Sequence, residues 1–142
     1  MGVRITRQPA IPKGTYYWSC SGQNFIARKP DTDPVTYGGT TGDVTAGGDG
    51  IPFRAPVFLP HGAVITAVEV FGNAAASAET WYLSRGNLST GASSDMGIAN
   101  INTEDTSISN ATIDNNTYCY WFNTSSLDSG DDIWGARIIY TL

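Results

Sequence analysis

The sequence predicts an all-β protein: a two-layer antiparallel β-sandwich of jelly-roll type with an extended N-terminal arm. Short segments rich in β-branched and aromatic residues recur along the chain, separated by clusters of Gly, Ser, Thr, Asn and Asp. No stretch of ten or more residues shows apolar positions at helical spacing. The clearest strand is 63–71, which contains three Val and one Ile, lacks Gly and Pro, and has the composition of a central strand.

The 142 residues fit one domain, preceded by a short arm. In the arm, residues 1–14, Val3 and Ile5 alternate with polar residues before a Pro-containing hinge, and the sandwich is expected over 15–142. A detached strand of this kind can add to the sheet of a neighbouring subunit. The alternatives are an edge strand of its own sandwich or a loose end.

Further strands are expected on both sides of 63–71. Those before it are 15–20, 24–29, 35–37 and 43–45, with a hairpin turn at 21–23 and the last two strands inside a Gly/Asp-rich loop over 30–50. Prolines 52, 56 and 60 favour an edge position for the segment that leads into 63–71.

After 63–71 the expected strands are 80–85, 98–101, 106–109, 117–123 and 133–142, with a polar loop over 86–97. Side chains alternate between the faces of a strand. This alternation predicts Trp81 and Leu83 on the face opposite Tyr82. It also places Trp134 on the same face as Ala136, Ile138 and Tyr140.

Composition excludes two classes of partner. The net charge is −5, and the eight basic residues are spread along the chain, so the basic patch needed for nucleic-acid binding is missing. No apolar run approaches the roughly 18 residues of a membrane span. Residues 1–15 lack the apolar core of a signal peptide, so either an upstream segment has been removed or the protein is assembled without secretion. We expect an extracellular, cell-surface or virion-surface location.

Three motifs in this order resemble a jelly-roll-like domain found in many large secreted or surface proteins of environmental bacteria. They are Asn24-Phe25-Ile26-Ala27-Arg28, the segment from Ala55-Pro56-Val57 through Leu59-Pro60-His61-Gly62-Ala63 to Ile65-Thr66, and Ala111-Thr112-Ile113-Asp114-Asn115 with Tyr118 and Tyr120, closed by 134–140. The resemblance covers about 120 residues and implies a non-catalytic, surface-exposed β module. It does not cover the arm or the segment around Trp18 and Cys20.

The sequence contains no catalytic motif, and we predict that the protein is not an enzyme. His61 is the only histidine and lies in a Pro-His-Gly turn, so a Ser-His-Asp arrangement has no support. A glycosidase needs two carboxylates that face a cleft. Glu69, Glu79 and Glu104 are the only glutamates, and a sandwich of this size offers little room for a deep cleft.

Two groups of residues suggest a structural cross-link or a metal. Cys20 and Cys119 lie in aromatic strands, and they form either a disulfide or two buried free thiols. The turn containing Asp128, Asp131 and Asp132 offers oxygen ligands of the kind that calcium prefers, although Asp is also common in ordinary turns. No other cofactor is expected.

Two further groups relate to sugars. Asn-x-Ser/Thr triplets begin at Asn87, Asn110, Asn115 and Asn123, and these are candidate glycosylation sites or chance occurrences. Aromatic side chains that either stack on sugar rings or fill the core are Trp18, Trp81, Trp121 and Trp134 with Tyr16, Tyr17 and Tyr82.

These observations lead to two functional hypotheses. The first is a non-catalytic structural subunit that binds copies of itself in a fibre, a surface layer or a virion decoration or fibre assembly, by exchange of the N-terminal strand. Neighbouring copies would cover strand edges that otherwise pair at random. The alternative is a monomeric carbohydrate-binding or adhesin module of a larger surface protein, with glycans as partners.

Overall fold

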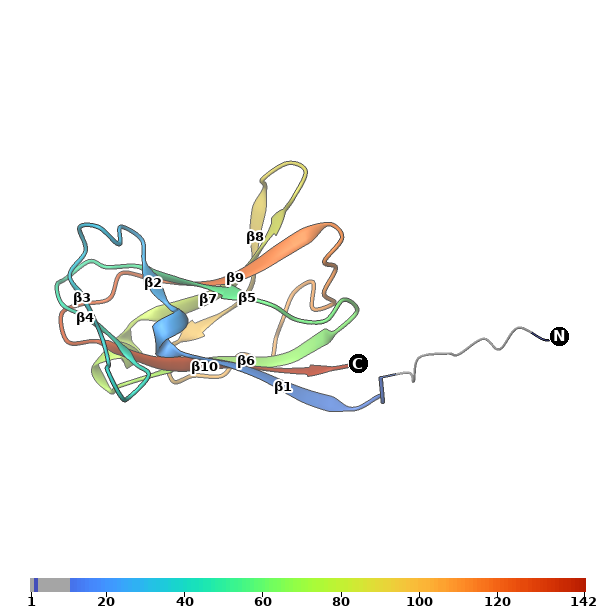
Figure 1. The fold of residues 1–142 in the computed structure, drawn as a ribbon, viewed down its shortest axis with the longest axis horizontal. Coiled ribbons are helices and arrows are strands. Elements are labelled where there is room, and N and C mark those ends of the chain that lie inside the picture. Colours follow the sequence, from blue (N-terminus) through green and yellow to red (C-terminus); the bar gives the residue numbers. More distant parts are fainter. Residues whose placement is uncertain (1, 3–10) are drawn as a thin grey trace.

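The computed structural model describes residues 2 and 11–142, and over this part of the chain it is a two-layer β-sandwich of jelly-roll type (Figure 1). Its ten strands form two antiparallel sheets, joined by loops and two short 3₁₀ helices. The predicted fold class is confirmed. Neither helix of the described residues is long or apolar enough to cross a membrane. Val3 and Ile5 of the predicted arm lie outside the described residues.

Strand β10 is the centre of the first sheet. The strands of this sheet are β1 (Thr15–Ser21), β3 (Val35–Tyr37), β4 (Val44–Ala46), β6 (Val64–Gly72) and β10 (Asp132–Thr141). One edge of β10 pairs with β1 and then with β4, and the other edge pairs with β6. The expectation that 63–71 is a central strand was therefore wrong. The edge of β6 that faces away from β10 pairs with no other strand of the described residues and forms only isolated β-bridges, to Thr112 and Asp105.

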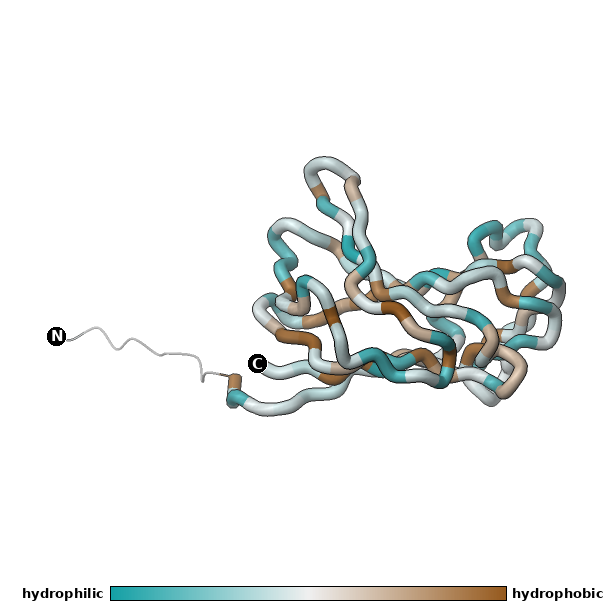
Figure 2. The backbone as a smooth tube through the Cα atoms, turned by 180° about the vertical axis from the view of Figure 1, so that it is seen from behind, coloured by the Kyte–Doolittle hydropathy of each residue, from teal (hydrophilic) through white to brown (hydrophobic). Residues whose placement is uncertain are grey.

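The second sheet has the strand order β2-β5-β9-β7-β8. Its strands are β2 (Ile26–Ala27), β5 (Phe53–Val57), β7 (Thr80–Asn87), β8 (Ser93–Asn100) and β9 (Tyr118–Thr124). In Figures 1 and 2 the hairpin between β7 and β8 rises away from the body of the sandwich. Strand β9 lies between β5 and β7, so its outward side chains are flanked by strands on both sides.

An aromatic cluster holds the two sheets together. The fully buried ring of Phe122 in β9 lies 6.3 Å from the Trp18 ring, 5.9 Å from the Phe25 ring and 6.3 Å from the Trp81 ring, centre to centre. Trp81 donates its indole N–H to the carbonyl of Thr103 at 3.1 Å, which satisfies the one polar group of the buried ring. Trp81 and Leu83 are buried and Tyr82 is outside, as predicted.

Three expected elements differ in the structure. Residues 22–24 form the 3₁₀ helix η1 (Gly22–Asn24) instead of a hairpin turn, and β1 and β2 belong to different sheets. The expected loop 86–97 contains most of β8. The exposed Ser and Asp residues at the start of this strand give it a polar composition like that of a loop. Residues 106–109 form no strand, although Asp105 bridges to Val68.

The predicted face of Trp134 was also wrong. The pairing of β10 with β6 shifts register between Ile133 and Gly135, which marks a β-bulge at Trp134. An extra residue in a strand reverses the alternation beyond it. Ile133, Ala136 and Ile138 are buried as a result, while Trp134 is 56% exposed on the outer face of the first sheet.

Candidate functional site

A groove follows strands β5 and β9 on the outer face of the second sheet. Three hollows of about 280, 570 and 240 Å³ lie along it. Arg54 lines both the first and the second, while Phe58, Cys119 and Tyr120 line both the second and the third. The three hollows neighbour one another along β5 and β9, a seven-residue strand roughly 20 Å long, and together they are called the β5–β9 groove.

Apolar side chains line the middle of the groove. Phe58, which follows β5, is 77% exposed, and Ile26 of β2 is 50% exposed. Pro56 and Trp121 are direct neighbours across the β5–β9 pair and line the same hollow. Large apolar side chains left open to water in one depression mark a binding surface more often than scattered ones do.

A glycine in the neighbouring strand leaves room for the Trp121 ring. Cys119, Trp121 and Asn123 point outward from β9, because Tyr120 and Phe122 point into the core. A Cβ atom on Gly86 of the neighbouring β7 would lie only 2.9 Å from the Trp121 ring atom Cζ3. The bare backbone of Gly86 therefore allows the indole to lie against β7.

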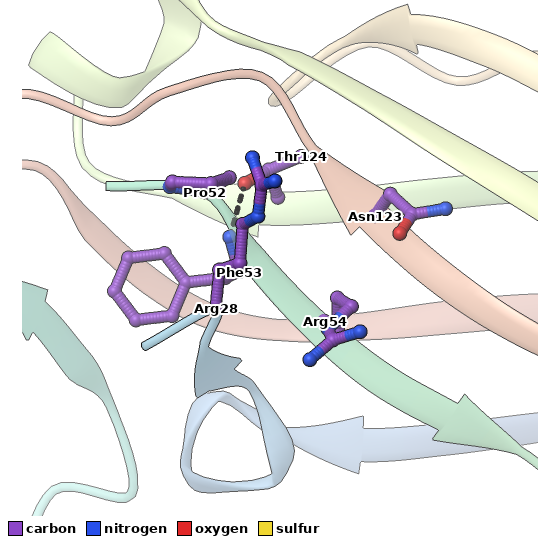
Figure 3. Close-up of a pocket in the computed structure, with 6 residues that line it drawn as sticks. All are labelled: Arg28, Pro52, Phe53, Arg54, Asn123 and Thr124. Carbon is purple, nitrogen blue, oxygen red and sulfur yellow. Dashed lines mark hydrogen bonds between the residues drawn. The ribbon is translucent and has the colours of Figure 1, made fainter. Parts of the chain in front are cut away.

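Polar groups are ordered beside the indole. The Ser84 hydroxyl donates to the Asp95 carboxylate at 2.7 Å and accepts a hydrogen bond from the Asn123 amide nitrogen at 3.0 Å. Ser84 is buried, so this chain of hydrogen bonds holds Asn123 in one orientation. Figure 3 shows Asn123 near Arg54, and the Arg28 side chain extending toward Pro52 and Thr124, at the first hollow. There the Phe53 N–H donates to the Thr124 hydroxyl at 2.9 Å.

The predicted aromatic residues divide between the core and the two outer faces. Tyr16 and Trp18 pack against the core, and Trp81 is part of it. Trp121 and Tyr82 belong to the outer face of the second sheet. Those on the outer face of the first sheet are Tyr17, which is 68% exposed, and Trp134.

The outer face of the first sheet holds a hollow of about 330 Å³, lined in part by Phe71 and Trp134. Arg137 lies across this face, with its guanidinium 5.3 Å from the centre of the Phe71 ring. The same guanidinium is 3.6 Å from the Glu69 carboxylate and 3.8 Å from the Glu104 carboxylate. These glutamates neutralise an arginine and do not face each other across a cleft.

The acidic turn brings together a different set of carboxylates from the predicted one. Carboxylate oxygens of Glu79, Asp128 and Asp131 lie within 4.8 Å of one another. The buried Asp131 carboxylate accepts the Asp128 backbone N–H at 2.8 Å, and the Ser125 hydroxyl donates to Glu79 at 3.0 Å. Asp132 is not in the cluster; its carboxylate accepts the Thr45 hydroxyl. Calcium binding stays a prediction.

His61 has a local role in a turn. Its Nδ1 accepts the backbone N–H of Asn115 at 3.2 Å, and it lies 3.8 Å from the Asp114 carboxylate. The pKa of Asp114 is lowered, chiefly by a hydrogen bond from the Thr117 side chain. The histidine side chain is largely exposed and contacts no candidate nucleophile.

Cys20 and Cys119 are free, so the disulfide considered above is not present. Cys20 lies in β1 of the first sheet, and burial raises the pKa of its thiol. Cys119 lies in β9 of the second sheet, faces outward into the β5–β9 groove and is exposed. The core of the sandwich separates the two side chains.

The four glycosylation triplets differ in how their asparagines are used. The side-chain amide nitrogen of Asn115 donates to the Leu59 carbonyl at 2.8 Å, and that of Asn123 donates to Ser84. The Asn87 side-chain oxygen accepts the backbone N–H groups of two residues in its own turn. Asn110 is exposed in a turn with a positive φ of 51°. Glycosylation stays a prediction.

The sequence analysis missed Arg28, Arg54, Ile26 and Phe58 as groove residues. Alternation in 53–57 already indicates that Arg54 and Pro56 face away from Phe53. That this face is hollow depends on the pairing of β5 with β2 and β9, which local sequence does not show.

No family model and no curated protein matches the chain. Three solved structures are similar to it in fold. The C-terminal CBM6 of LamC, a marine laminarinase from Zobellia galactanivorans, has a TM-score of 0.56 at 12% identity, covering 87% of this chain and 98% of that one. At this identity the likeness concerns the fold alone, a jelly-roll sandwich.

The other two are less similar. The xylan-binding module CBM15 has a TM-score of 0.46 at 19% identity, covering 91% of this chain and 97% of that one. The C-terminal family 22 carbohydrate-binding module of Clostridium thermocellum Xyn10B has a TM-score of 0.45 at 13% identity, covering 89% and 94%.

Proposed function

We propose that this protein is a non-catalytic carbohydrate-binding module that holds an extended glycan chain in the β5–β9 groove. The observation that carries the proposal is the groove itself, in which Trp121 and exposed apolar side chains lie beside ordered polar groups. Sugar rings have apolar C–H faces and hydroxyl-bearing edges, so they suit a surface that combines aromatic rings with fixed donors and acceptors.

The groove suits a chain more than a single sugar. Its three open hollows lie one after another beside β9, a strand roughly 20 Å long. The likeness in fold to the LamC module, whose name describes a carbohydrate-binding domain, agrees with this class of function. The neighbours thus favour the alternative of the two hypotheses over self-assembly. We include an extracellular site of action in the proposal, because the polysaccharides of cell walls and extracellular matrices lie outside cells.

The test compares two tryptophans on opposite outer faces, the half-buried Trp121 and the exposed Trp134. Binding to laminarin, xylan and polygalacturonate is measured by affinity electrophoresis and calorimetry for the wild type, Trp121→Ala and Trp134→Ala. We expect wild-type binding to at least one polysaccharide and a loss of about tenfold or more in Trp121→Ala, from the apolar area the indole contributes. Trp134→Ala serves as the matched control and should bind as the wild type does.

Two results would contradict the proposal. One is a wild-type protein that binds no polysaccharide in a broad panel. The other is binding that Trp134→Ala removes and Trp121→Ala does not, which would move the site to the first sheet. Thermal unfolding of each variant shows that a loss of binding is not a loss of fold.

A further inference from the structure

Two arginines at one end of the β5–β9 groove distinguish it from a neutral sugar site. Arg28 follows β2, and its backbone N–H donates to the Pro52 carbonyl at 2.9 Å. Arg54 is in β5, directly opposite Asn123 of β9. Both side chains line the first hollow with Asn123, and both residues are exposed (Figure 3).

Neither arginine is neutralised by the protein. Among the described residues, the ion pairs involve His61 and Arg137 only, so no carboxylate lies within ion-pair distance of Arg28 or Arg54. Arg85, by contrast, lies over the Tyr118 ring at 4.0 Å. The first hollow therefore holds two unpaired guanidinium groups in a chain of net charge −5.

The opposite side of the same face carries a negative charge. Asp95 in β8 is separated from Arg54 by β9 and β7, and it accepts the Ser84 hydroxyl. Asp95 lies three strand spacings, roughly 14 Å, from Arg54, and ionic screening acts over about 10 Å, so a ligand group in the first hollow interacts with the two arginines more than with Asp95. An anionic ligand group is favoured at the arginine end and disfavoured near Asp95.

We propose that the β5–β9 groove selects an acidic polysaccharide, with the ring carboxylate of a uronic acid unit bound between Arg28 and Arg54. This inference rests on the proposed carbohydrate-binding function and specifies its ligand class. A guanidinium offers two parallel N–H donors that match the two oxygens of a carboxylate. With its amide nitrogen held by Ser84, Asn123 presents its oxygen as an acceptor for a sugar hydroxyl beside that carboxylate.

The position of the arginines fits a uronic acid in particular. Its carboxylate is attached directly to a ring carbon, so the charge lies at the edge of the ring. A chain that stacks on Trp121 in the second hollow passes Arg54, which lines both hollows, on its way to the first. One chain can therefore contact the aromatic surface and the charged end together.

The experiment measures binding of polygalacturonate, of the same polymer with its carboxylates methyl-esterified, of dextran sulfate and of neutral xylan. The proteins are the full chain as wild type, Arg28→Ala, Arg54→Ala, Arg54→Lys and Lys13→Ala. Lys13 is exposed and lines none of the three hollows, so its replacement changes the net charge equally without touching the groove. The arginines are exposed, so the variants should keep the wild-type fold, which thermal unfolding checks.

We expect polygalacturonate to bind about tenfold or more tightly than its methyl ester, as the loss of charge-assisted hydrogen bonds predicts. Arg28→Ala and Arg54→Ala should each weaken binding of the acidic polymer about five- to tenfold, with little change for xylan. Arg54→Lys should restore only part of the affinity, because an ammonium group keeps the charge and lacks the fork. Lys13→Ala should bind as the wild type does.

Several outcomes would overturn the inference. Equal binding of polygalacturonate and its methyl ester, with arginine variants unchanged, would refute the acidic ligand while leaving carbohydrate binding intact. If dextran sulfate binds as tightly as polygalacturonate or more tightly, and the arginine variants weaken both equally, the preferred anionic group would be a sulfate and the uronic acid proposal would be wrong. A wild type that binds none of the four polymers would refute the inference, and binding of the same protein to laminarin or another neutral glycan would leave the proposed function standing.

Discussion

Replacing Phe122 by alanine should destabilise the protein strongly, because this ring connects both sheets. It is fully buried and lies within 6.3 Å, centre to centre, of Trp18, Phe25 and Trp81. Truncation of a buried phenylalanine costs about 3–5 kcal/mol. Three aromatic contacts are lost at once, each worth about 0.5–1.5 kcal/mol beyond area, so we expect a value of about 4–5 kcal/mol.

This loss is large against the total stability of about 5–15 kcal/mol that domains have. At about 3 °C per kcal/mol for a chain of this size, Tm should fall by roughly 12–15 °C. Urea unfolding followed by tryptophan fluorescence gives the free energy directly, and the slope with denaturant should be unchanged if the native state keeps its compactness.

Two control variants separate packing from binding. Phe122→Leu refills most of the space and should cost about 1–2 kcal/mol. Trp121→Ala, the next residue on the same strand but on the outer face, should cost about 1 kcal/mol or less while reducing glycan affinity. A Phe122→Ala variant within 1 kcal/mol of the wild type would refute the assignment of β9 faces on which the groove depends.

Four further predictions concern single sites. A bulky maleimide should label Cys119 rapidly and Cys20 slowly, and mass spectrometry of digests identifies the modified thiol. The protein labelled at Cys119 should lose glycan binding, and bound glycan should protect Cys119 from labelling. Because burial raises the pKa of the Cys20 thiol, its neutral form stabilises the fold at pH values below the ordinary value of 9.0, and this contribution should be lost as pH rises above it. A Cys20→Ser variant should show a flatter dependence of Tm on pH in that range. Gly86→Ala should displace the Trp121 ring and weaken glycan binding several-fold with little change in Tm, whereas an unchanged affinity would show that the ring position is not critical. Asp131→Asn should lower Tm by a few degrees, because the carboxylate accepts a buried backbone N–H. If the turn also binds calcium, adding calcium raises the Tm of the wild type and not of the variant. Identical Tm values of the wild type with calcium and with chelator would contradict the metal prediction.

Local pattern was sufficient for much of the fold. Alternation with period two identified the strands and most inward faces, because a side chain on a strand points to the opposite face from its neighbour whatever the strand pairs with. Trp81 and Leu83 were placed correctly in this way. The brief strands predicted at 35–37 and 43–45 within an otherwise Gly-rich loop correspond to β3 and, shifted by one residue, to β4.

Pairing between distant segments decided the rest. The bulge at Trp134 lies in the register of β10 against β6, and it puts that ring on the face opposite Ala136 and Ile138, with which it was predicted to share a face. The exposed strand β8 has a polar composition like that of a loop, and only its pairing with β7 defines it as a strand.

The candidate site likewise depends partly on local sequence and partly on pairing between distant segments. The sequence alone indicated a small β-sandwich with no recognisable catalytic motif, and it left open whether the aromatic rings stack on sugars or fill the core. Only the tertiary structure decided which side chains face outward together. Trp121, Arg54 and Arg28 come from three strands or their ends, which meet through hydrogen bonds between segments up to about 70 residues apart. A binding surface forms only where side chains from distant segments come together, so local sequence does not reveal it. A segment's preference for an extended conformation depends on its own side chains, so local sequence does reveal that.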